Sequence, residues 1–409
     1  MNDSLLRRVH LDEETLQRRR ATFPLGAALT WEIASDERRM DVLHRLRAVE
    51  PVTWCDAVGG WLVTSRALAQ EVYRSPDRFT VHAEPNLVRA VLGEMMLAVD
   101  GAEHDRHREP FNPTFKFRAV RERFESTAEH HATRLLDGIA GRPEADLCAD
   151  YAAPFAVSMA AEVLGLELDQ IQDLRQTYDL FAAALTAYDD PECVAQARAA
   201  RTRLTEQLTE QLHAAREAKR PSLLADVAAA GALTEDEVTA NARVIMFGAI
   251  ETVEAMIVNT SWALVTHPEA RAAVVEIRDL LSSAVDEALR WLPPVGFVER
   301  WATKDTTLGG VEIAAGDFVV PFLVAANRDP AHFPDPDRFD LHRANARQAL
   351  SFSQAAHHCL GVNLARLEGR IAVGELFRRW PGLTLDPTVA CEPSGFSSRR
   401  LHTLPVRLL

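Results

Sequence analysis

Several features that assign a chain to a special class of protein are missing from this sequence. No uninterrupted apolar run approaches the roughly 20 residues that a helix needs to cross a bilayer, and the first residues lack the apolar segment of a signal peptide. The five cysteines have no regular spacing, which argues against a disulfide framework. Positive charge is in deficit: the formal net charge is −14, which argues against nucleic acid or an anionic membrane as a partner. We therefore expect a cytoplasmic protein.

What is present is an ordinary globular composition, with 47% hydrophobic residues among 409. Alternation over residues 52–64 predicts a β-hairpin, and helical periodicity begins at about Ser35. Short strands and turns follow Pro293-Pro294, among them a hairpin turning at Gly309-Gly310. Long helical patterns occupy residues 119–139, 151–164, 169–187 and 193–219. The fold class is therefore mainly α with a smaller β-rich part, and the chain has no internal repeat.

One cysteine precedes an amphipathic helix in the stretch FSQAAHHCLGVNLAR, residues 352–366. The helix is predicted from the apolar residues Leu360, Leu364, Leu367 and Ile371. A thiolate at Cys359 would face the unpaired N–H groups and the positive dipole end of that helix, which favours the metal-binding form of sulfur. Cys359 is therefore a candidate iron ligand, although a lone cysteine is more commonly a small buried apolar residue.

Zinc is the alternative metal, because His357, His358 and Cys359 are adjacent and because His104 and His107 have a metal-like spacing. Structural zinc sites usually pair their ligands as C-x2-C or H-x3-H. No second such pair stands near the His-His-Cys run, so iron is the better expectation.

A long central helix is predicted to begin at a capping box, Thr234 with Glu237, and to end before residues 267–268. At about thirty residues it would be roughly 45 Å long and could cross the molecule. Its apolar face contains Glu251 and Thr252. Taken alone, the pattern favours a helix in which Glu251 points to solvent and Thr252 bonds to the carbonyl one turn earlier.

The cysteine stretch resembles the haem-binding loop of the cytochromes P450, whose pattern is F-G-x-G-x-H-x-C-x-G. The matching residues are Phe352, His357, Cys359 and Gly361. The resemblance implies that Cys359 is the thiolate ligand of the iron of haem b, that dioxygen is the co-substrate, and that His357 contacts a haem propionate. Ser353 and Ala355 stand where the pattern has glycine, and a φ above zero would cost on the order of 1 kcal/mol at each.

The sequence GAIET in the central helix resembles the P450 motif [AG]-G-x-[DE]-T, with Ala249 at the second glycine. The resemblance implies that Gly248 and Ala249 leave room beside the iron for dioxygen. It also implies that Thr252 donates a hydrogen bond to the oxygen and that Glu251 relays protons inward.

Two further segments resemble propionate-binding landmarks of the family. His104 and Arg108 resemble its H-x-x-x-R pair, for which a surface charge cluster is the competing interpretation. Pro110 is expected to end that helix early. Arg300 in VERWATKD resembles the R-x-A-x-x-D turn and implies a third propionate contact.

Glu287 and Arg290 lie on one face of a predicted helix and resemble the E-x-x-R pair of the family, although exposed pairs at this spacing are common and contribute little. Arg338 in PDPDRF matches the third member of the family's buried network, with Arg343 as the alternative.

The resemblance covers nearly the whole chain and implies one P450 domain over residues 1–409. Its β-rich parts are expected at about 50–65 and 295–350, and its helical body at about 66–292 and 359–380. The implied substrate pocket is apolar and shows no cationic anchor, which favours a neutral or weakly polar organic substrate. Its expected lining residues are Leu92, Met95, Met96, Phe247, Ile250, Val295, Phe297 and Phe396.

The function implied is that of a monooxygenase that hydroxylates, epoxidises or demethylates a small molecule in secondary metabolism or catabolism. It would take two electrons from a ferredoxin or flavodoxin-type donor with its NAD(P)H reductase. The basic residues near Cys359 are either a solvated helix face or a docking site for that donor: Arg366, Arg370, Arg378 and Arg379. A haem-thiolate peroxygenase or isomerase is an alternative enzyme, and a non-catalytic haem-binding sensor is the alternative outside catalysis.

Overall fold

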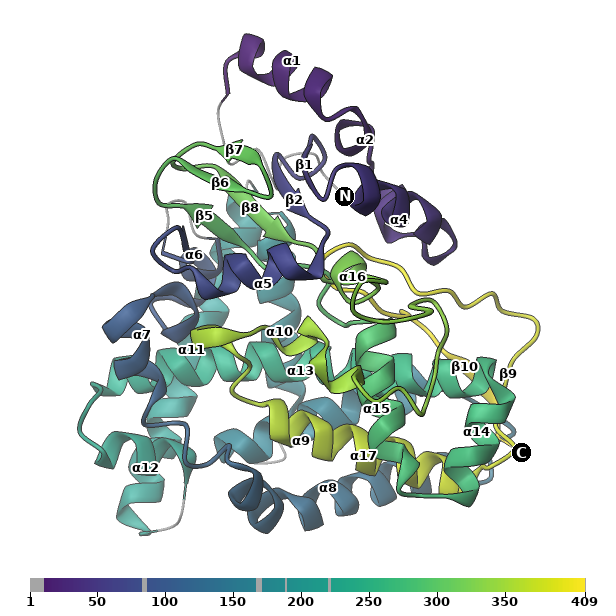
Figure 1. Cartoon of the computed structure of the whole chain (residues 1–409). Helices are drawn as coiled ribbons and strands as arrows, with labels where there is room; N and C mark the ends of the chain where they lie inside the picture. Colours follow the sequence, from purple (N-terminus) through teal and green to yellow (C-terminus); the bar gives the residue numbers. More distant parts are fainter. Residues whose placement is uncertain (1–10, 83–86, 167–170, 188–189, 220–221, 409) are drawn as a thin grey trace.

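The computed structural model describes residues 11–82, 87–166, 171–187, 190–219 and 222–408 (Figure 1). Helices dominate it, as the sequence predicts. The N-terminal and middle helices are α1 (Glu13–Thr22), α2 (Pro24–Ala27), α3 (Trp31–Ser35), α4 (Met40–Val49), α5 (Arg66–Arg74), α6 (Leu87–Leu92), α7 (Gly101–Arg108), α8 (Phe117–Ile139), α9 (Ala153–Leu164), α10 (Ile171–Thr186) and α11 (Pro191–Glu217). The later helices are α12 (Leu223–Ala229), α13 (Glu235–Thr266), α14 (Pro268–Glu276), α15 (Leu280–Trp291), α16 (Leu323–Ala326) and α17 (Val362–Arg379).

The main sheet has five strands in the order β1-β2-β8-β5-β3. Its strands are β1 (Val52–Cys55), β2 (Gly60–Val63), β3 (Phe79–Thr80), β5 (Arg300–Ala302) and β8 (Phe318–Pro321). The predicted hairpin at 52–64 is confirmed, since Val52 lies opposite Val63 in an antiparallel pair. Strand β2 continues into a parallel pair with β8, in which Trp61 is opposite Val319. The sheet therefore joins the start of the chain to its last quarter.

Two smaller sheets complete the β structure. The hairpin of β6 (Thr306–Leu308) and β7 (Val311–Ile313) turns at Gly309-Gly310, as the sequence predicts. The other sheet has the order β4-β10-β9, from β4 (Glu144–Asp146), β10 (Pro405–Arg407) and β9 (Thr384–Leu385).

Helix α13 runs through the middle of the helical body in Figure 1 and packs on α9, α11, α15 and α17. The capping box at its start is confirmed: the Thr234 side chain accepts the Glu237 N–H, and the Glu237 side chain accepts the Thr234 N–H. By length and composition α13 could cross a membrane, but 67% of its most apolar window is buried inside the protein. It is therefore a core helix, and Met256 of α13 packs against Gly369 of α17.

Two expected helices begin differently. The helix expected from Ser35 is interrupted, because the Asp36 side chain accepts the Arg38 N–H and starts a 3-10 turn before α4 begins at Met40. The helix expected from Tyr151 enters α9 through a π-helical turn at Cys148–Ala152. Asp169, the expected start of α10, lies outside the described residues.

Candidate active site

The loop before α17 holds Cys359 in a defined position. The Cys359 N–H donates to the Phe352 carbonyl at 2.8 Å, and Gly361 is the N-cap of α17. The side chain is partly exposed. Burial raises the pKa of the Cys359 thiol, against the opposing effects of the Gly361 N–H and the positive charge of Arg108. The N–H group at the helix start therefore favours the thiolate, as the sequence suggested, but burial has the larger effect on the protein without a metal.

The same loop keeps a glycine-type backbone without glycine. Ser353 has φ 58° and ψ −168°, and Ala355 has φ 58°. The first combination is a region that only glycine occupies readily, so the loop stores strain on the order of 1–3 kcal/mol at such a residue. A loop that tolerates this cost is held in place by its surroundings.

Buried cationic and imidazole groups gather beside this loop. The His104 ring lies 4.4 Å from that of His357 and is 1% exposed, and its Nε2 has no hydrogen-bond partner among the described residues. Arg300 is also buried, with one guanidinium N–H donating to the Glu299 carbonyl. A buried polar atom without a partner is unfavourable, and a carboxylate placed here would satisfy both side chains. This fits the propionates of a haem.

The other two predicted propionate contacts are engaged within the protein. His357 Nε2 pairs with Asp100 Oδ1 at 2.8 Å, and burial lowers the pKa of His357. Arg108 donates to the His358 carbonyl at 2.6 Å and so braces the cysteine loop. Helix α7 ends at Arg108, which agrees with the early end expected from Pro110.

The middle of α13 presents an opening next to an alcohol and an acid. Gly248 is exposed, and a Cβ built on it would meet no described atom within 4 Å. The Thr252 hydroxyl donates to the Gly248 carbonyl, as the isolated helix pattern favours. Glu251 does not point freely to solvent: its carboxylate accepts from the Tyr178 hydroxyl and, at 2.7 Å, from the Ser398 hydroxyl. Open space at Gly248, beside a hydrogen-bonded acid and alcohol, fits a small ligand bound next to a cofactor.

Comparison with known proteins decides the family. The family model "Cytochrome P450" matches residues 171–394. The chain belongs to the cytochrome P450 family. It is 33% identical to the vitamin D(3) 25-hydroxylase of Pseudonocardia autotrophica over 358 residues, covering 83% of this chain and 86% of the relative. It is 32% identical to the 20-oxo-5-O-mycaminosyltylactone 23-monooxygenase of Streptomyces fradiae over 357 residues, covering 84% and 83%.

The solved structures confirm the fold. The testosterone complex of CYP109E1 from Bacillus megaterium matches this P450 with a TM-score of 0.82 at 23% identity, covering 90% of this chain and 97% of the other. P450s bind haem b through a cysteine thiolate and use dioxygen, so the protein is a haem-dependent monooxygenase.

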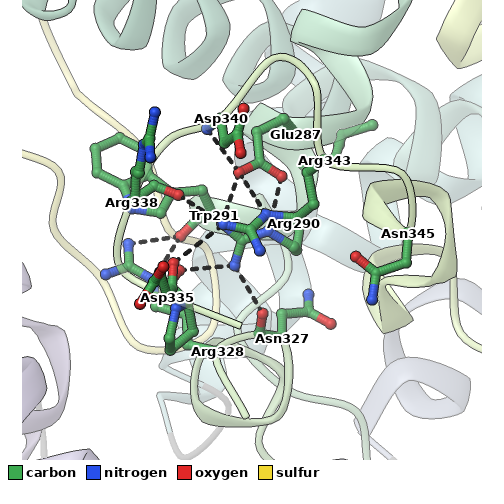
Figure 2. Close-up of polar contacts among 12 residues, drawn as sticks. Glu287, Arg290, Trp291, Asn327, Arg328, Asp335, Arg338, Asp340, Arg343 and Asn345 are labelled. Carbon is green, nitrogen blue, oxygen red and sulfur yellow. Dashed lines mark hydrogen bonds and ion pairs between the residues drawn. The ribbon is translucent and has the colours of Figure 1, made fainter. Parts of the chain in front are cut away.

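A buried charge network lies beside the cysteine loop of this P450 (Figure 2). Glu287 and Arg290 are fully buried, and Arg290 donates to both Glu287 carboxylate oxygens at 2.8 Å. The third member of the network is Arg343, whose Nε donates to Glu287 Oε1 at 3.0 Å. The Asp340 N–H donates to the same oxygen at 3.0 Å.

The assignment of Arg338 to this network is wrong. Arg338 is exposed and contributes its backbone carbonyl, which accepts from Arg290 at 3.2 Å and from Arg343 at 3.1 Å (Figure 2). The physical reason is the burial of the next residue, Phe339, which turns the Arg338 side chain outward. The alternative from the sequence, Arg343, is the residue that the structure brings to Glu287.

On the side of the cysteine helix away from α13, α8 and α17 border a cavity of about 320 Å³ that Arg366 and Arg370 help to line. The four basic residues singled out in the sequence are paired: Arg366 with Asp286 at 2.7 Å, Arg370 with Glu125 at 2.6 Å, Arg378 with Glu375 at 2.8 Å, and Arg379 with Asp137 at 2.5 Å. Phe117, at the edge of the cavity, is 65% exposed.

The expected substrate-lining residues fall into two groups. Leu92, Met95, Met96, Ile250 and Phe396 are buried. Phe247, Val295 and Phe297 are partly buried, and the Phe247 ring stacks on Tyr178 at 5.3 Å. Sequence reasoning missed Tyr178, Ser398 and Asp100, because each reaches the site from an element distant in sequence and none belongs to a motif.

Proposed function

We propose that this P450 holds haem through Cys359 and takes two electrons from a separate donor protein to insert one oxygen atom into a small, mostly apolar organic molecule. The observation that supports this most directly is the fixed position of Cys359 just before α17, in a loop beside the buried His104 and His357 rings. The exposed turn of α13 at Gly248, which carries Glu251 and Thr252, supplies the acid and the alcohol.

The haem, when bound, supplies electron transfer and the activation of dioxygen. The residues of this chain bind the haem and hold the loop that carries Cys359. His104 and Arg300 bind the propionates through donors that the protein leaves free. The Arg366 guanidinium lies over the Phe352 ring, with its Cζ 5.0 Å from the centre of the ring. This contact helps to fix the loop that presents the Cys359 sulfur. Ala249 adds a methyl group beside Gly248, at the position where the family pattern has glycine.

Proton transfer is the proposed role of Thr252 and Glu251. The Thr252 hydroxyl can turn from the Gly248 carbonyl toward a ligand in the open space beside Gly248, and its proton is then replaced from the carboxyl group next to it. Two hydroxyl groups, those of Tyr178 and Ser398, already bond to Glu251 and can pass a proton on to it. An enzyme that reduces and cleaves dioxygen needs such a supply of protons, whereas one that starts from peroxide, or an isomerase, does not.

The substrate proposed is neutral or weakly polar, since the expected lining residues are apolar. The two relatives above are named for oxidising vitamin D(3) and a mycaminosyltylactone, which supports a secondary metabolite as the substrate class. The electron donor is proposed to be a ferredoxin or a flavodoxin-type protein with its NAD(P)H reductase, which docks over the cavity that Arg366 and Arg370 help to line. A cytoplasmic location suits such a donor.

The test begins with the iron ligand. Cys359→Ala should abolish the thiolate-type red-shifted band of the reduced carbon monoxide complex, and the matched control Cys391→Ala should keep it. An unchanged band in Cys359→Ala would show that another residue is the ligand.

The second step tests the reaction. A spectral titration of the oxidised wild type with a library of apolar compounds identifies binders through displacement of the sixth iron ligand. Product formed from such a binder should require dioxygen, NADPH and the donor proteins. Rapid turnover with hydrogen peroxide alone would instead favour a peroxygenase.

A further inference from the structure

An ionic cluster joins the site acid to a helix on the far side of α13. Its members are Glu251 and Glu254 of α13, Arg175 and Tyr178 of α10, and Arg400 of the C-terminal segment. Glu254 is 4% exposed and binds both arginines: Arg175 at 3.1 Å through one carboxylate oxygen, and Arg400 through the other. Burial raises the pKa of Glu254, and the two guanidinium groups oppose this effect.

Arg400 also reaches the acid of the site. Its Nε lies 3.3 Å from Glu251 Oε1, close enough for an ion pair. The geometry is not that of a hydrogen bond, and this buried Nε has no aligned acceptor among the described residues. A small rotation of the Glu251 carboxylate toward Arg400 would complete that bond. Arg400 therefore limits the directions in which Glu251 can turn.

Helix α10 contacts each of the two carboxylates once. Tyr178 donates to Glu251 while its ring stacks on Phe247, and Arg175 binds Glu254 one turn further along α13. Without Tyr178, Glu251 would lose a donor, and without Arg175, Glu254 would keep only Arg400 among the described residues. The freed charge on Glu254 would then draw Arg400 from Glu251, because a buried carboxylate is costly without its full set of partners.

We propose that Arg400 is a positioning residue for Glu251, and that Arg175 and Tyr178 support this arrangement from α10. The inference rests on the proposed role of Glu251 as the proton relay and adds the residues that hold it.

The experiment uses haem-loaded full-length protein, a plant-type ferredoxin, its reductase and NADPH. It measures the fraction of NADPH electrons recovered as hydrogen peroxide, the product expected when protons arrive too slowly. The variants are Glu251→Gln, Arg400→Met, the double variant and Tyr178→Phe, which keeps the aromatic stack. Arg142→Met is the matched control, because Arg142 forms an exposed ion pair with Asp150. The carbon monoxide spectrum checks that each variant holds haem as a thiolate complex.

We expect Glu251→Gln and Arg400→Met each to raise the peroxide fraction by at least about threefold relative to Arg142→Met. The double variant should give a peroxide fraction no higher than that of Glu251→Gln alone, because Arg400 acts through Glu251. Arg400→Lys should give a peroxide fraction between those of wild type and Arg400→Met. Tyr178→Phe should raise the fraction, as Arg400→Met does. If Arg400→Met does not retain haem, Tyr178→Phe and Arg400→Lys supply the comparison with Glu251→Gln.

Different results separate the two proposals. Suppose that Glu251→Gln raises the peroxide fraction while Arg400→Met and Tyr178→Phe match the control. This result would overturn the positioning role alone. Additive effects of Glu251→Gln and Arg400→Met in the double variant would also overturn the positioning role, since they would mean that Arg400 acts independently of Glu251. No change in Glu251→Gln would overturn the relay role and the positioning role with it.

Discussion

Replacing Arg343 by methionine should destabilise the protein, whereas the same change at Arg338 should not. Both arginines lie in one irregular segment and both were candidates for the third position of the Glu287 network. The structure separates them, because the Arg343 side chain is 6% exposed and bonded to Glu287, whereas the Arg338 side chain is exposed. The two substitutions are therefore a matched test of which arginine binds Glu287 in the network.

The magnitude follows from the bonds that are lost. Arg343 donates to the fully buried Glu287 carboxylate at 3.0 Å, and a hydrogen bond to a charged group contributes about 1.5–3 kcal/mol. It also donates to the carbonyls of Pro334 and Asp335 on the exposed side, where water can replace it. Glu287 keeps Arg290, so the loss stays below the roughly 3–5 kcal/mol of a fully broken buried pair. We expect a decrease of about 2–4 kcal/mol in the free energy of unfolding.

The assay is thermal unfolding followed by circular dichroism, with haem absorbance recorded in parallel. For a chain of 409 residues, an unfolding entropy of about 2.1 cal/mol/K per residue converts this loss into a decrease in Tm of about 2–5 °C. Arg338→Met should change Tm by less than about 1 °C, as surface substitutions usually do. Equal decreases in the two variants, or a larger one in Arg338→Met, would refute the assignment.

Three further predictions follow from the site. Ser353→Gly should stabilise the protein by about 1 kcal/mol in urea titrations, because glycine adopts φ 58° without strain; a loss of stability would contradict the strained-loop description. His104→Leu should speed haem transfer to apomyoglobin about tenfold by removing one propionate donor, and an unchanged rate would place the propionates elsewhere. Burial raises the pKa of Glu368 from 4.5 to about 8. The folded state thus binds a proton that the unfolded state releases, and wild type should lose stability relative to Glu368→Gln by about 1.4 kcal/mol per pH unit between about pH 5 and 8. Parallel stability curves of wild type and Glu368→Gln would exclude a buried titrating carboxyl.

The features predicted correctly from the sequence are those that depend on neighbours along the chain. The pairing of Glu287 with Arg290 follows from their spacing on one helix, and the capping box of α13 follows from Thr234 and Glu237. The two members of each pair lie within one helical turn, so their spacing in the sequence determines how they are placed in space.

The features that the sequence did not predict depend on distant packing. Arg343 replaces Arg338 in the network because the burial of Phe339 decides which side chain turns inward. Tyr178 and Ser398 reach Glu251 from positions 73 and 147 residues away, and no spacing rule relates them to it. The strained conformation of Ser353 likewise opposes its local preference, so only the surrounding fold can impose it.

The parallel pairing of β2 with β8 has a consequence for how the protein is made. Trp61 and its partner Val319 are separated by 319 − 61 = 258 positions. At about 5–20 residues per second, a ribosome needs roughly 13–50 s to synthesise that interval. During this time the apolar edge of the first hairpin has no native neighbour, which makes it a natural target for chaperones that bind nascent chains. Expression at a lower temperature or with added chaperones should therefore raise the yield of soluble protein more than adding a haem precursor does.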